Sequence, residues 1–481
     1  MRLEVYDVWT WIEGKFQAQL LDPVTSYMSP SRYFVESYKK GIWDGRVRYV
    51  KRHKDSGRYY FPTGLFPRVT RYLRKKNIYH IVDDKRKIEP CQNEPVFELA
   101  GKRLDLTPYD YQARAVEACL VNGRGIVQTP TGSGKSLIGI AVIKTLDLPS
   151  IWLTHRLNLL YQTKRVMEEC LGEEIGIVGD SQIDYRKFTI GMVQSVCSEK
   201  HREFLKTRDM VVGDEIHHLE STMWYDNFAS CPAPYRFGLS ATPCLENDGL
   251  SLLGMAGDII YQVSAKDLVD RGVLCQPRIF FIRMDNVPLD SKLRFAAVYS
   301  QGIVENEARN RKIIDVAKTF RDEGKNCLTL VNRVSHGKDL TALMKRSDIK
   351  AEFVYGKSTK EERDQAFDDL FSGKLDNIVA TAQIVGEGSD FPQLECLINA
   401  TGGKGGGDAS DSGETGRVTI QILGRGMRKH PKKKTFDYVD FLDNSHRFLK
   451  NASRDRISTL RSEGYTEFID FWENRKNGNG Q

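Results

Sequence analysis

A glycine loop between two apolar segments carries the strongest chemical signal in the sequence. It follows residues 125–127 and precedes residues 137–143, so the expected order is strand, loop and helix. Backbone N–H groups in such a loop can surround phosphate oxygens, and the helix N-terminus adds positive potential. Lys135 is expected to reach the β- and γ-phosphates of a nucleotide, and the Ser136 hydroxyl to hold Mg²⁺. The alternative is a structural turn, because the first glycine of the strict P-loop pattern is replaced by threonine. The loop residues are Thr129, Pro130, Thr131, Gly132, Ser133, Gly134, Lys135 and Ser136.

Two adjacent acids follow another apolar run, at residues 210–213. Asp214 is the expected Mg²⁺-holding carboxylate of a P-loop NTPase, and Glu215 can orient or deprotonate the attacking water. Either acid alone could cap a helix, but the glycine loop upstream favours the catalytic interpretation. Gln112 begins a helix shortly before the loop, and its amide can both donate to and accept from an adenine edge. His217 is expected to couple sites through hydrogen bonds.

Several further apolar runs end in polar residues. Buried strands whose C-terminal ends turn polar are typical of a parallel α/β sheet, where ligands bind at those ends. The alternation of strand and helix starts again near residue 275, without a second glycine loop. The sequence therefore predicts two α/β lobes, of which the first binds nucleotide through the glycine loop. The runs are residues 151–156, 188–195, 237–243, 327–333, 377–381, 396–400 and 435–441, the last of which is the expected final strand before a helical end at 445–475.

Two arginines, Arg425 and Arg428, lie near one face of a helix predicted to open at Val418. Arginine suits a phosphoryl group because its fork is always charged and donates twice. Supplied from a second lobe, such a residue can contribute about 10³–10⁵ in rate. A basic surface helix is the alternative. Residues 402–416 are rich in glycine and are predicted to form a mobile loop or flexible connector.

Residues 1–95 form a separate and very basic block. Residues 33–35 and 47–50 are predicted strands, residues 66–76 a helix, and residues 78–104 a connector. Cations interleaved with aromatic residues suit a nucleic-acid surface, whereas a solvated face over an aromatic core is the alternative. Contact with duplex near a fork is expected from cations that include Lys51, Arg52 and Lys54.

Composition excludes several classes of protein. The 481 residues are 40% apolar and 28% charged with a net charge of +7, which describes an ordinary globular chain of about two to four domains. No apolar run approaches the roughly 20 residues of a membrane span, and the N-terminus is not signal-like. The nine cysteines form no CxxC pair, which favours a reducing interior and no zinc ribbon. We therefore expect a cytoplasmic location.

Taken in order, these segments resemble the motifs of a superfamily 2 helicase across residues 105–445. Gln112 is similar to the Q motif, residues 129–136 to motif I and residues 214–217 to motif II. The other similar stretches are residues 153–162, 191–195, 240–242, 332–333, Thr381 with Gly388 and Asp390, and residues 421–428. The resemblance implies two tandem RecA-like parallel-sheet lobes, a small α+β N-terminal domain, and ATP with Mg²⁺ between the lobes.

The resemblance also implies a role for each matching residue. ATP would contact residues 129–136 together with Gln112, His217, Gly388, Asp390 and Gln421, while Ser240 and Thr242 would couple hydrolysis to movement. Arg425 and Arg428 would complete catalysis beside Lys135, Asp214 and Glu215, with Ser136 and Asp214 on the metal. Nucleic acid would contact Thr154, Arg156, Gln194, Ser195, Asn332, Arg333 and Thr381.

Residues 41–48, 62–65 and 334–338 resemble phage UvsW-type recombination helicases more closely. That type implies DNA as partner, movement from 3′ to 5′, and branch migration of forks or Holliday junctions in recombination, repair and replication. It also implies a bacterial cytoplasm, or a phage protein in the cytoplasm of its host. An RNA helicase, a binding module with ATP as a clamp, and the motor of a restriction complex stay open, as does the oligomeric state, a monomer included. The implied domains are residues 1–95, 105–270, 275–445 and a C-terminal extension at 446–481.

Overall fold

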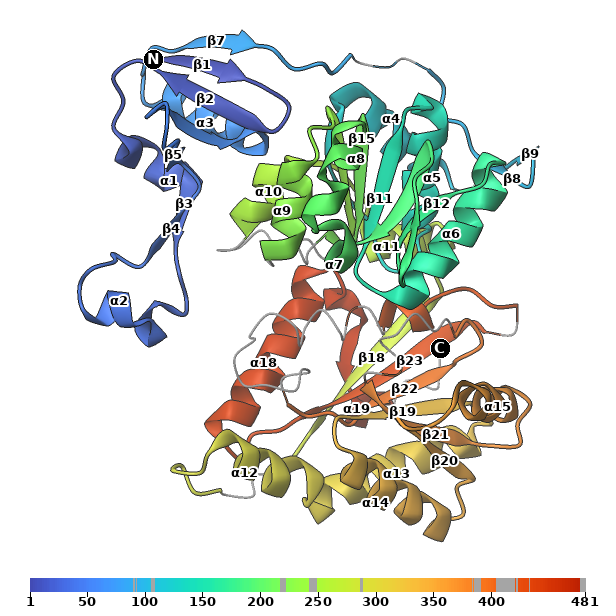
Figure 1. Cartoon of the computed structure of the whole chain (residues 1–481). Coiled ribbons are helices and arrows are strands. Elements are labelled where there is room, and N and C mark those ends of the chain that lie inside the picture. The colour runs from blue at the N-terminus through green and yellow to red at the C-terminus, as the bar shows by residue number, and fades with distance from the viewer. Residues whose placement is uncertain are drawn as a thin grey trace. The chain divides into compact units, whose positions relative to one another are not determined.

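The computed structural model describes residues 1–89, 91, 93–104, 109–216, 222–241, 249–285, 289–382, 384, 391–403, 420, 423–431 and 433–475. The chain forms two compact units (Figure 1). One comprises Met1–Thr129 and Gly134–Val263, and the other comprises Pro130–Ser133 and Ser264–Gln481. Among the described residues, none of the helices combines the length and apolar content that a bilayer crossing would require.

The N-terminal block of the first unit is built on a mixed five-stranded sheet in the order β5-β6-β2-β1-β7. The predicted helix is confirmed as α3 (Phe66–Lys75), which buries Val69 and Leu73. The predicted connector is wrong over its first part, because β7 lies within it and pairs in parallel with β1. The strands are β1 (Arg2–Val5), β2 (Trp9–Glu13), β5 (Lys51–Arg52), β6 (Tyr59–Pro62) and β7 (Ile81–Asp84).

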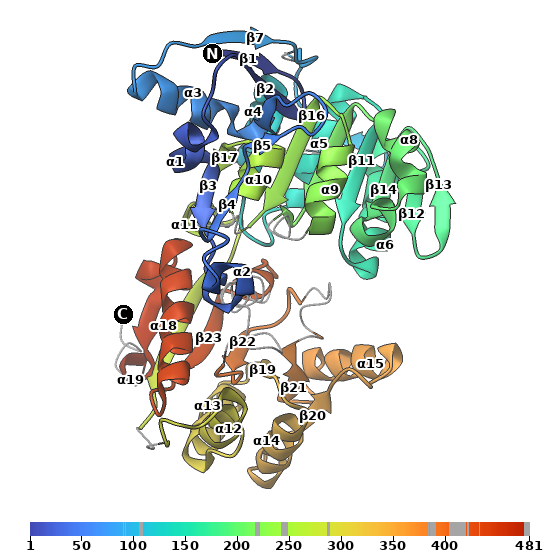
Figure 2. The same cartoon turned by 60° about the vertical axis from the view of Figure 1, so that its left-hand side comes forward.

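An arm projects from this block. It consists of residues 26–48, in which β3 (Ser26–Met28) and β4 (Arg46–Arg48) pair as an antiparallel ribbon. Both views show the ribbon leading away from the five-stranded sheet, with α2 (Glu36–Lys39) at its far end (Figures 1 and 2). The predicted strand at residues 33–35 is wrong, because Arg32–Phe34 form a 3₁₀ turn. The Tyr33 ring packs on Tyr38 within the arm instead of joining a sheet.

The rest of the first unit is an eight-stranded sheet in the order β13-β12-β14-β11-β15-β16-β10-β17. Its strand pairs are parallel except for the hairpin of β12 and β13. The strands are β10 (Arg124–Gln128), β11 (Ser150–Thr154), β12 (Gly176–Gly179), β13 (Gln182–Asp184), β14 (Phe188–Met192), β15 (Met210–Asp214), β16 (Tyr235–Ser240) and β17 (Ile259–Gln262). Helices of this unit include α4 (Asp110–Asn122), α5 (Lys135–Leu146), α6 (Leu157–Leu171), α7 (Val193–Val196), α9 (Thr222–Ser230) and α10 (Gly249–Ala256).

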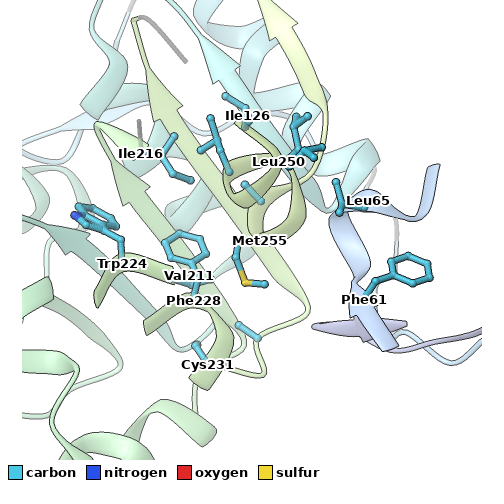
Figure 3. Close-up of a cluster of buried hydrophobic side chains, with 14 of the residues drawn as sticks. Phe61, Leu65, Ile126, Val211, Ile216, Trp224, Phe228, Cys231, Leu250 and Met255 are labelled. Carbon is cyan, nitrogen blue, oxygen red and sulfur yellow. The ribbon is translucent and has the colours of Figure 1, made fainter. Parts of the chain in front are cut away.

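The N-terminal block and this sheet share one hydrophobic core. Phe61 and Leu65 of the block belong to the same cluster of buried side chains as Leu250 and Met255 of α10, and Figure 3 shows Leu65 beside Leu250. Burying both sets of side chains against each other removes their apolar surface from water, which stabilises the docked block. The short turn Thr63–Leu65 of the N-terminal block packs directly on the backbone of α10.

The second unit holds a seven-stranded sheet in the order β20-β21-β19-β22-β23-β18-β24. The described pairs are all parallel, so the predicted fold class of two α/β lobes with a small mixed N-terminal sheet is confirmed. The prediction of a wholly helical end is wrong, because β24 (Ile469–Phe471) follows helix α18 (Arg447–Ser462) and extends the sheet beside β18. The other strands are β18 (Gln276–Arg283), β19 (Cys327–Val331), β20 (Ala351–Val354), β21 (Asn377–Thr381), β22 (Cys396–Asn399) and β23 (Thr435–Leu442). Its helices include α11 (Ala265–Asp270), α12 (Phe295–Tyr299), α13 (Glu307–Asp322), α14 (Val334–Arg346), α15 (Lys360–Phe371) and α19 (Trp472–Arg475).

Candidate active site

The glycine loop spans the interval between β10 and α5. Gly132 and Gly134 have φ angles of +87° and +82°, in the left-handed region that glycine adopts without a steric penalty. The Thr129 N–H donates to the Ser240 carbonyl at 3.1 Å, which ties the start of the loop to the end of β16. Helix α5 begins at Lys135, so its first N–H groups and the positive end of its dipole lie at the end of the loop. This backbone is a suitable cradle for phosphate.

Strand register brings the chemically important residues of the first unit to one edge of the sheet. Gln128 of β10 pairs with Ser240 of β16, and Leu239 of β16 pairs with Asp214 of β15. Because the three strands are parallel and in step, their carboxyl ends coincide. The loop, the serine and the acidic pair therefore share the edge at which open α/β sheets bind ligands.

A buried charge cluster occupies this edge. The Lys135 Nζ lies 3.7 Å from Oε1 of Glu215, and the Glu215 N–H donates to Oδ1 of Asp214 at 3.0 Å. Burial and, to a smaller extent, the Glu215 charge raise the pKa of Asp214 to about 7, against the opposing effects of the Lys135 charge and the Glu215 N–H. Glu215 itself has a φ of +51°, an uncommon backbone state for a residue other than glycine. Such local strain concentrates at functional sites.

The cluster fits a hydrated magnesium ion that arrives with a nucleotide. Mg²⁺ prefers oxygen ligands and is usually held by one or two carboxylates together with substrate phosphates. The Asp214 carboxylate is buried and its charge is only partly compensated, and Ser136 offers a hydroxyl in the first turn of α5. Within the described part of the chain, no group of three or more His, Cys, Asp or Glu side chains is placed to hold a metal ion.

Gln112 lies against the glycine loop from the side of α4. Its side chain is buried, and a β-carbon at Gly134 would fall 2.4 Å from the Gln112 Nε2. The amide therefore reaches the loop, as expected for a residue that contacts the base of a nucleotide held there.

The structure brings together three of the predicted nucleic-acid contacts at the next strands of the sheet. Thr154 ends β11 opposite Met192 of β14, and its buried hydroxyl has no hydrogen-bond partner among the described residues. The Gln194 amide donates to the His155 carbonyl at 3.2 Å, and Arg156 Nε donates to the His155 ring at 3.0 Å. His155 was missed by sequence reasoning, although its place between two predicted contacts was a signal. Ser195 lies beside Gln194 in α7.

In the second unit, two strand ends carry the corresponding predicted residues. Val331 of β19 pairs with Thr381 of β21, so Asn332 and Arg333, which follow β19, emerge at the same edge as Thr381. The Arg333 guanidinium lies 5.6 Å from the centre of the Tyr299 ring. Burial raises the pKa of Tyr299 to about 12. Sequence reasoning missed Tyr299, because an isolated tyrosine at the end of a short helix carries no motif signal.

The arginine pair of the second unit lies on a short helical segment, residues 423–426, and the turn after it. The Arg428 N–H donates to the Arg425 carbonyl at 3.4 Å, and Cys275 N–H donates to the Met427 carbonyl at 2.8 Å. Both arginines are partly exposed. Of the predicted site residues, His217, Thr242, Gly388, Asp390 and Gln421 lie outside the described residues.

The three cations of the N-terminal block that are expected to contact duplex lie on β5 and the turn after it. Lys51, Arg52 and Lys54 are all exposed. The Lys51 Nζ lies 5.8 Å from the centre of the Tyr225 ring of α9, and the Arg52 guanidinium lies 6.0 Å from that of Tyr59. Their charged ends remain accessible to a polyanion.

Comparison with known proteins gives two family matches in the order of the two lobes. The family described as "Type III restriction enzyme, res subunit" matches residues 105–245, and "Helicase conserved C-terminal domain" matches residues 308–430. The first match contains the glycine loop and the acidic pair, and the second contains both arginines.

Two relatives and one solved structure illustrate the likeness. "ATP-dependent DNA helicase uvsW" of Enterobacteria phage T4 is 24% identical over 467 residues, covering 89% of this chain and 87% of the relative. "DNA 3'-5' translocase XPB2" of Sulfurisphaera tokodaii is 23% identical over 379 residues, covering 70% of this chain and 82% of the relative. The structure entitled "ATP-dependent Type ISP restriction-modification enzyme LlaBIII bound to DNA" aligns with a TM-score of 0.55 at 15% identity, covering 75% of this chain and 30% of that chain. At this identity the structural likeness shows the fold alone.

Proposed function

Because the chain belongs to helicase superfamily 2, we propose that it is an ATP-driven motor that moves 3′ to 5′ on DNA and remodels forks and Holliday junctions. The observation that carries the motor chemistry is the alignment of the glycine loop, Lys135, Asp214 and Glu215 at one sheet edge. The names of two relatives support DNA and the direction of movement. Branched DNA as the substrate is what the resemblance of residues 41–48, 62–65 and 334–338 to UvsW-type recombination helicases implies, and the match to the phage T4 relative over most of both chains supports that resemblance.

In the proposed reaction the glycine loop holds the nucleotide phosphates through backbone N–H groups, and Lys135 compensates their charge. Glu215, whose Oε1 lies 3.7 Å from the Lys135 Nζ, orients the attacking water and accepts its proton. Gln112 contacts the adenine edge. Asp214 and Ser136 would hold a Mg²⁺ ion, which would supply positive charge against the negative charge that develops during phosphoryl transfer.

The proposed nucleic-acid path follows the strand ends beyond the ATP site. In the first lobe it includes Thr154, Arg156, Gln194 and Ser195, and in the second lobe it includes Asn332, Arg333 and Thr381. Hydroxyl, amide and guanidinium groups of this kind contact phosphate and sugar, so we expect little sequence preference. Cyclic movement of the lobes would advance these contacts along one strand.

Hydrolysis is proposed to depend on closure of the lobes during the cycle. In the closed state Arg425 and Arg428 would stabilise the charge on the transferred phosphoryl group. Ser240 with Thr242 would couple hydrolysis to strand movement, while His217, Gly388, Asp390 and Gln421 would complete the nucleotide site. We propose that the functional parts are residues 1–95, which grip duplex, residues 105–270 and 275–445, which form the motor, and the extension at 446–481.

The motor subunit of a restriction-type complex is the second candidate. The observation in its favour is the family match over residues 105–245, whose description is a restriction subunit. Such a motor would be stimulated by linear duplex at least as strongly as by a branched substrate.

Steady-state ATPase measured in parallel with no polymer, single-stranded DNA, linear duplex, four-way junction DNA and RNA tests the proposal. We expect the strongest stimulation by forked or four-way DNA. Linear duplex as the best activator would favour the restriction-type motor. RNA as the best activator would preserve the motor chemistry and overturn the DNA assignment.

A further inference from the structure

The far end of the arm exposes two large apolar side chains that its own packing does not use. Phe34 is 83% exposed and Ile42 is 78% exposed. Phe34 ends the 3₁₀ turn after β3, and Ile42 lies between α2 and β4, so both belong to the segment that joins the two strands of the ribbon. Single exposed apolar residues are ordinary, but two at the end of a projecting element suggest contact with a partner.

The arm is ordered by a small aromatic cluster of its own. The Tyr38 ring packs edge-on against Tyr33 at 5.6 Å and Trp43 at 6.2 Å, measured between ring centres. The Trp43 indole N–H donates to the Arg46 carbonyl at 2.8 Å. Gly45 closes the cluster, because a β-carbon there would lie 2.9 Å from both Arg32 and Tyr38. Tyr38 and Trp43 are thus half-buried in this cluster and Tyr33, which is 58% exposed, packs at its edge, while Phe34 is not part of the cluster.

A preordered element presents its exposed side chains at a low entropic cost of binding. The arm needs no folding step on contact, in contrast to a disordered loop. Its exposed apolar groups are therefore suited to a rigid, flat and apolar target.

The charge of the arm restricts the class of partner. Residues 26–48 contain five cationic side chains and two acidic ones. Both acids are already paired, Glu36 with Lys40 and Asp44 with Arg48. Lys39 and Lys40 flank the apolar tip and are exposed. Apolar groups with cations at their border match the stacked bases and phosphates of nucleic acid, where Phe and Ile act as wedges at base steps.

We propose that Phe34 and Ile42 at the tip of the arm stack against the bases at a DNA branch point and keep them unpaired while the motor moves. The inference rests on the proposed function, because it names the arm as the element of that motor that contacts the branch point of the DNA. The cations at the tip hold the neighbouring phosphates. Loss of the tip would then reduce strand separation without reducing nucleotide hydrolysis.

The test compares a Phe34→Ala/Ile42→Ala double variant with the wild-type chain and a matched control. Tyr79→Ala is the control, because Tyr79 is 81% exposed in the same unit but lies outside the arm. The probe is a forked duplex with 2-aminopurine at the branch, whose fluorescence rises when the base is unstacked. The second measurement is ATPase stimulated by single-stranded DNA, which contains no branch.

The wild-type chain and the Tyr79 variant should raise the fluorescence on binding without ATP, and the double variant should not. Unwinding of the fork should fall about tenfold in the double variant, within the range for loss of stacked contacts, while ATPase with single-stranded DNA changes less than twofold. Phe34→Trp, with Ile42 kept, should retain the fluorescence rise, because tryptophan also stacks.

The first two sets of results below would overturn the inference, and the last would overturn the proposed function instead. Equal fluorescence and unwinding in the double variant and the wild type would show that the tip does not contact bases. Equal losses of ATPase with every polymer, or a change of ATPase without DNA, would show that the arm supports the motor itself. A wild-type chain that binds the fork and unstacks the probe without DNA-stimulated ATPase would refute the proposed function and leave the contact of the arm intact.

Discussion

Gly64 offers a way to loosen the N-terminal block without altering its charged surface. It lies in the turn Thr63–Leu65, and a β-carbon there would fall 1.9 Å from the Leu253 carbonyl oxygen and 2.6 Å from that of Gly254. Real β-carbons essentially never approach another heavy atom closer than 3.0 Å. Gly64→Ala therefore requires the turn and α10 to separate by about 1 Å, the difference between these two distances.

The cost of this change should be substantial because the obstructing atoms are backbone. Overpacking of a close-packed contact costs about 1–3 kcal/mol, and a carbonyl cannot rotate away as a flexible side chain can. Each kcal/mol lowers the melting temperature of a unit of this size by roughly 2–4 °C. We expect the melting temperature of the first unit to fall by about 2–12 °C, with faster amide exchange around Phe61 and Leu65. Fork unwinding should fall, while ATPase without polymer changes little.

Gly356→Ala is the matched control, because no atom lies within 4 Å of its β-carbon position and its φ is not positive. It should leave melting, exchange and unwinding unchanged. If Gly64→Ala retains the wild-type melting temperature and exchange protection, the docking of the block on α10 is not a stabilising contact. If docking is lost and unwinding is retained, the block has no part in strand separation.

Three further outcomes are expected. Glu215→Gln should abolish ATP turnover and leave ATP binding, measured with a fluorescent nucleotide, unchanged. Retained turnover would mean that another residue activates the attacking water. Burial and the Arg309 charge lower the pKa of His336 to about 3, so the unfolded chain gains a proton below pH 6.5 that the folded chain does not. Stability of the second unit should thus fall as pH drops from about 6.5 towards 3, and His336→Gln should flatten this loss in thermal melts. Reversing the charges of Lys51, Arg52 and Lys54 should weaken junction binding and reduce the slope of log affinity against log salt by up to about 3. Unchanged affinity at moderate salt would mean that these residues do not contact the junction.

The motor lobes were predictable from sequence because their strands are short, continuous apolar runs with polar ends. Residues 151–156 and 377–381 needed only this local pattern, and β11 and β21 confirm it. The pattern of apolar runs failed where contacts outside the run itself decide the structure. Residues 33–35 looked like a strand, but local ring packing stabilises a 3₁₀ turn, and β24 exists because the free edge of β18 is available far away in sequence.

The candidate site was predictable in composition and not in geometry. Motif spacing identified Lys135, Asp214 and Glu215, whereas their alignment depends on the register of β10, β15 and β16. The left-handed backbone at Glu215 carries no sequence signal, because glutamate rarely adopts it. His155 could have been suspected from its place between two predicted contacts, whereas Tyr299 is recognised only once its ring contact with Arg333 is known.

The β5 cations and the arm tip represent two kinds of DNA contact that salt can separate. Contacts of Lys51, Arg52 and Lys54 with phosphate release counterions, so their loss changes how steeply affinity depends on salt. Stacking by Phe34 and Ile42 releases few ions, so its loss should lower affinity by a similar factor at every salt concentration. One salt titration of the wild type and both variants therefore distinguishes the contacts. Parallel lines for the wild type and the Phe34→Ala/Ile42→Ala variant, with a shallower line for the charge variant, are the expected result. A shallower line for the arm variant would mean that the tip acts by placing its lysines on phosphate.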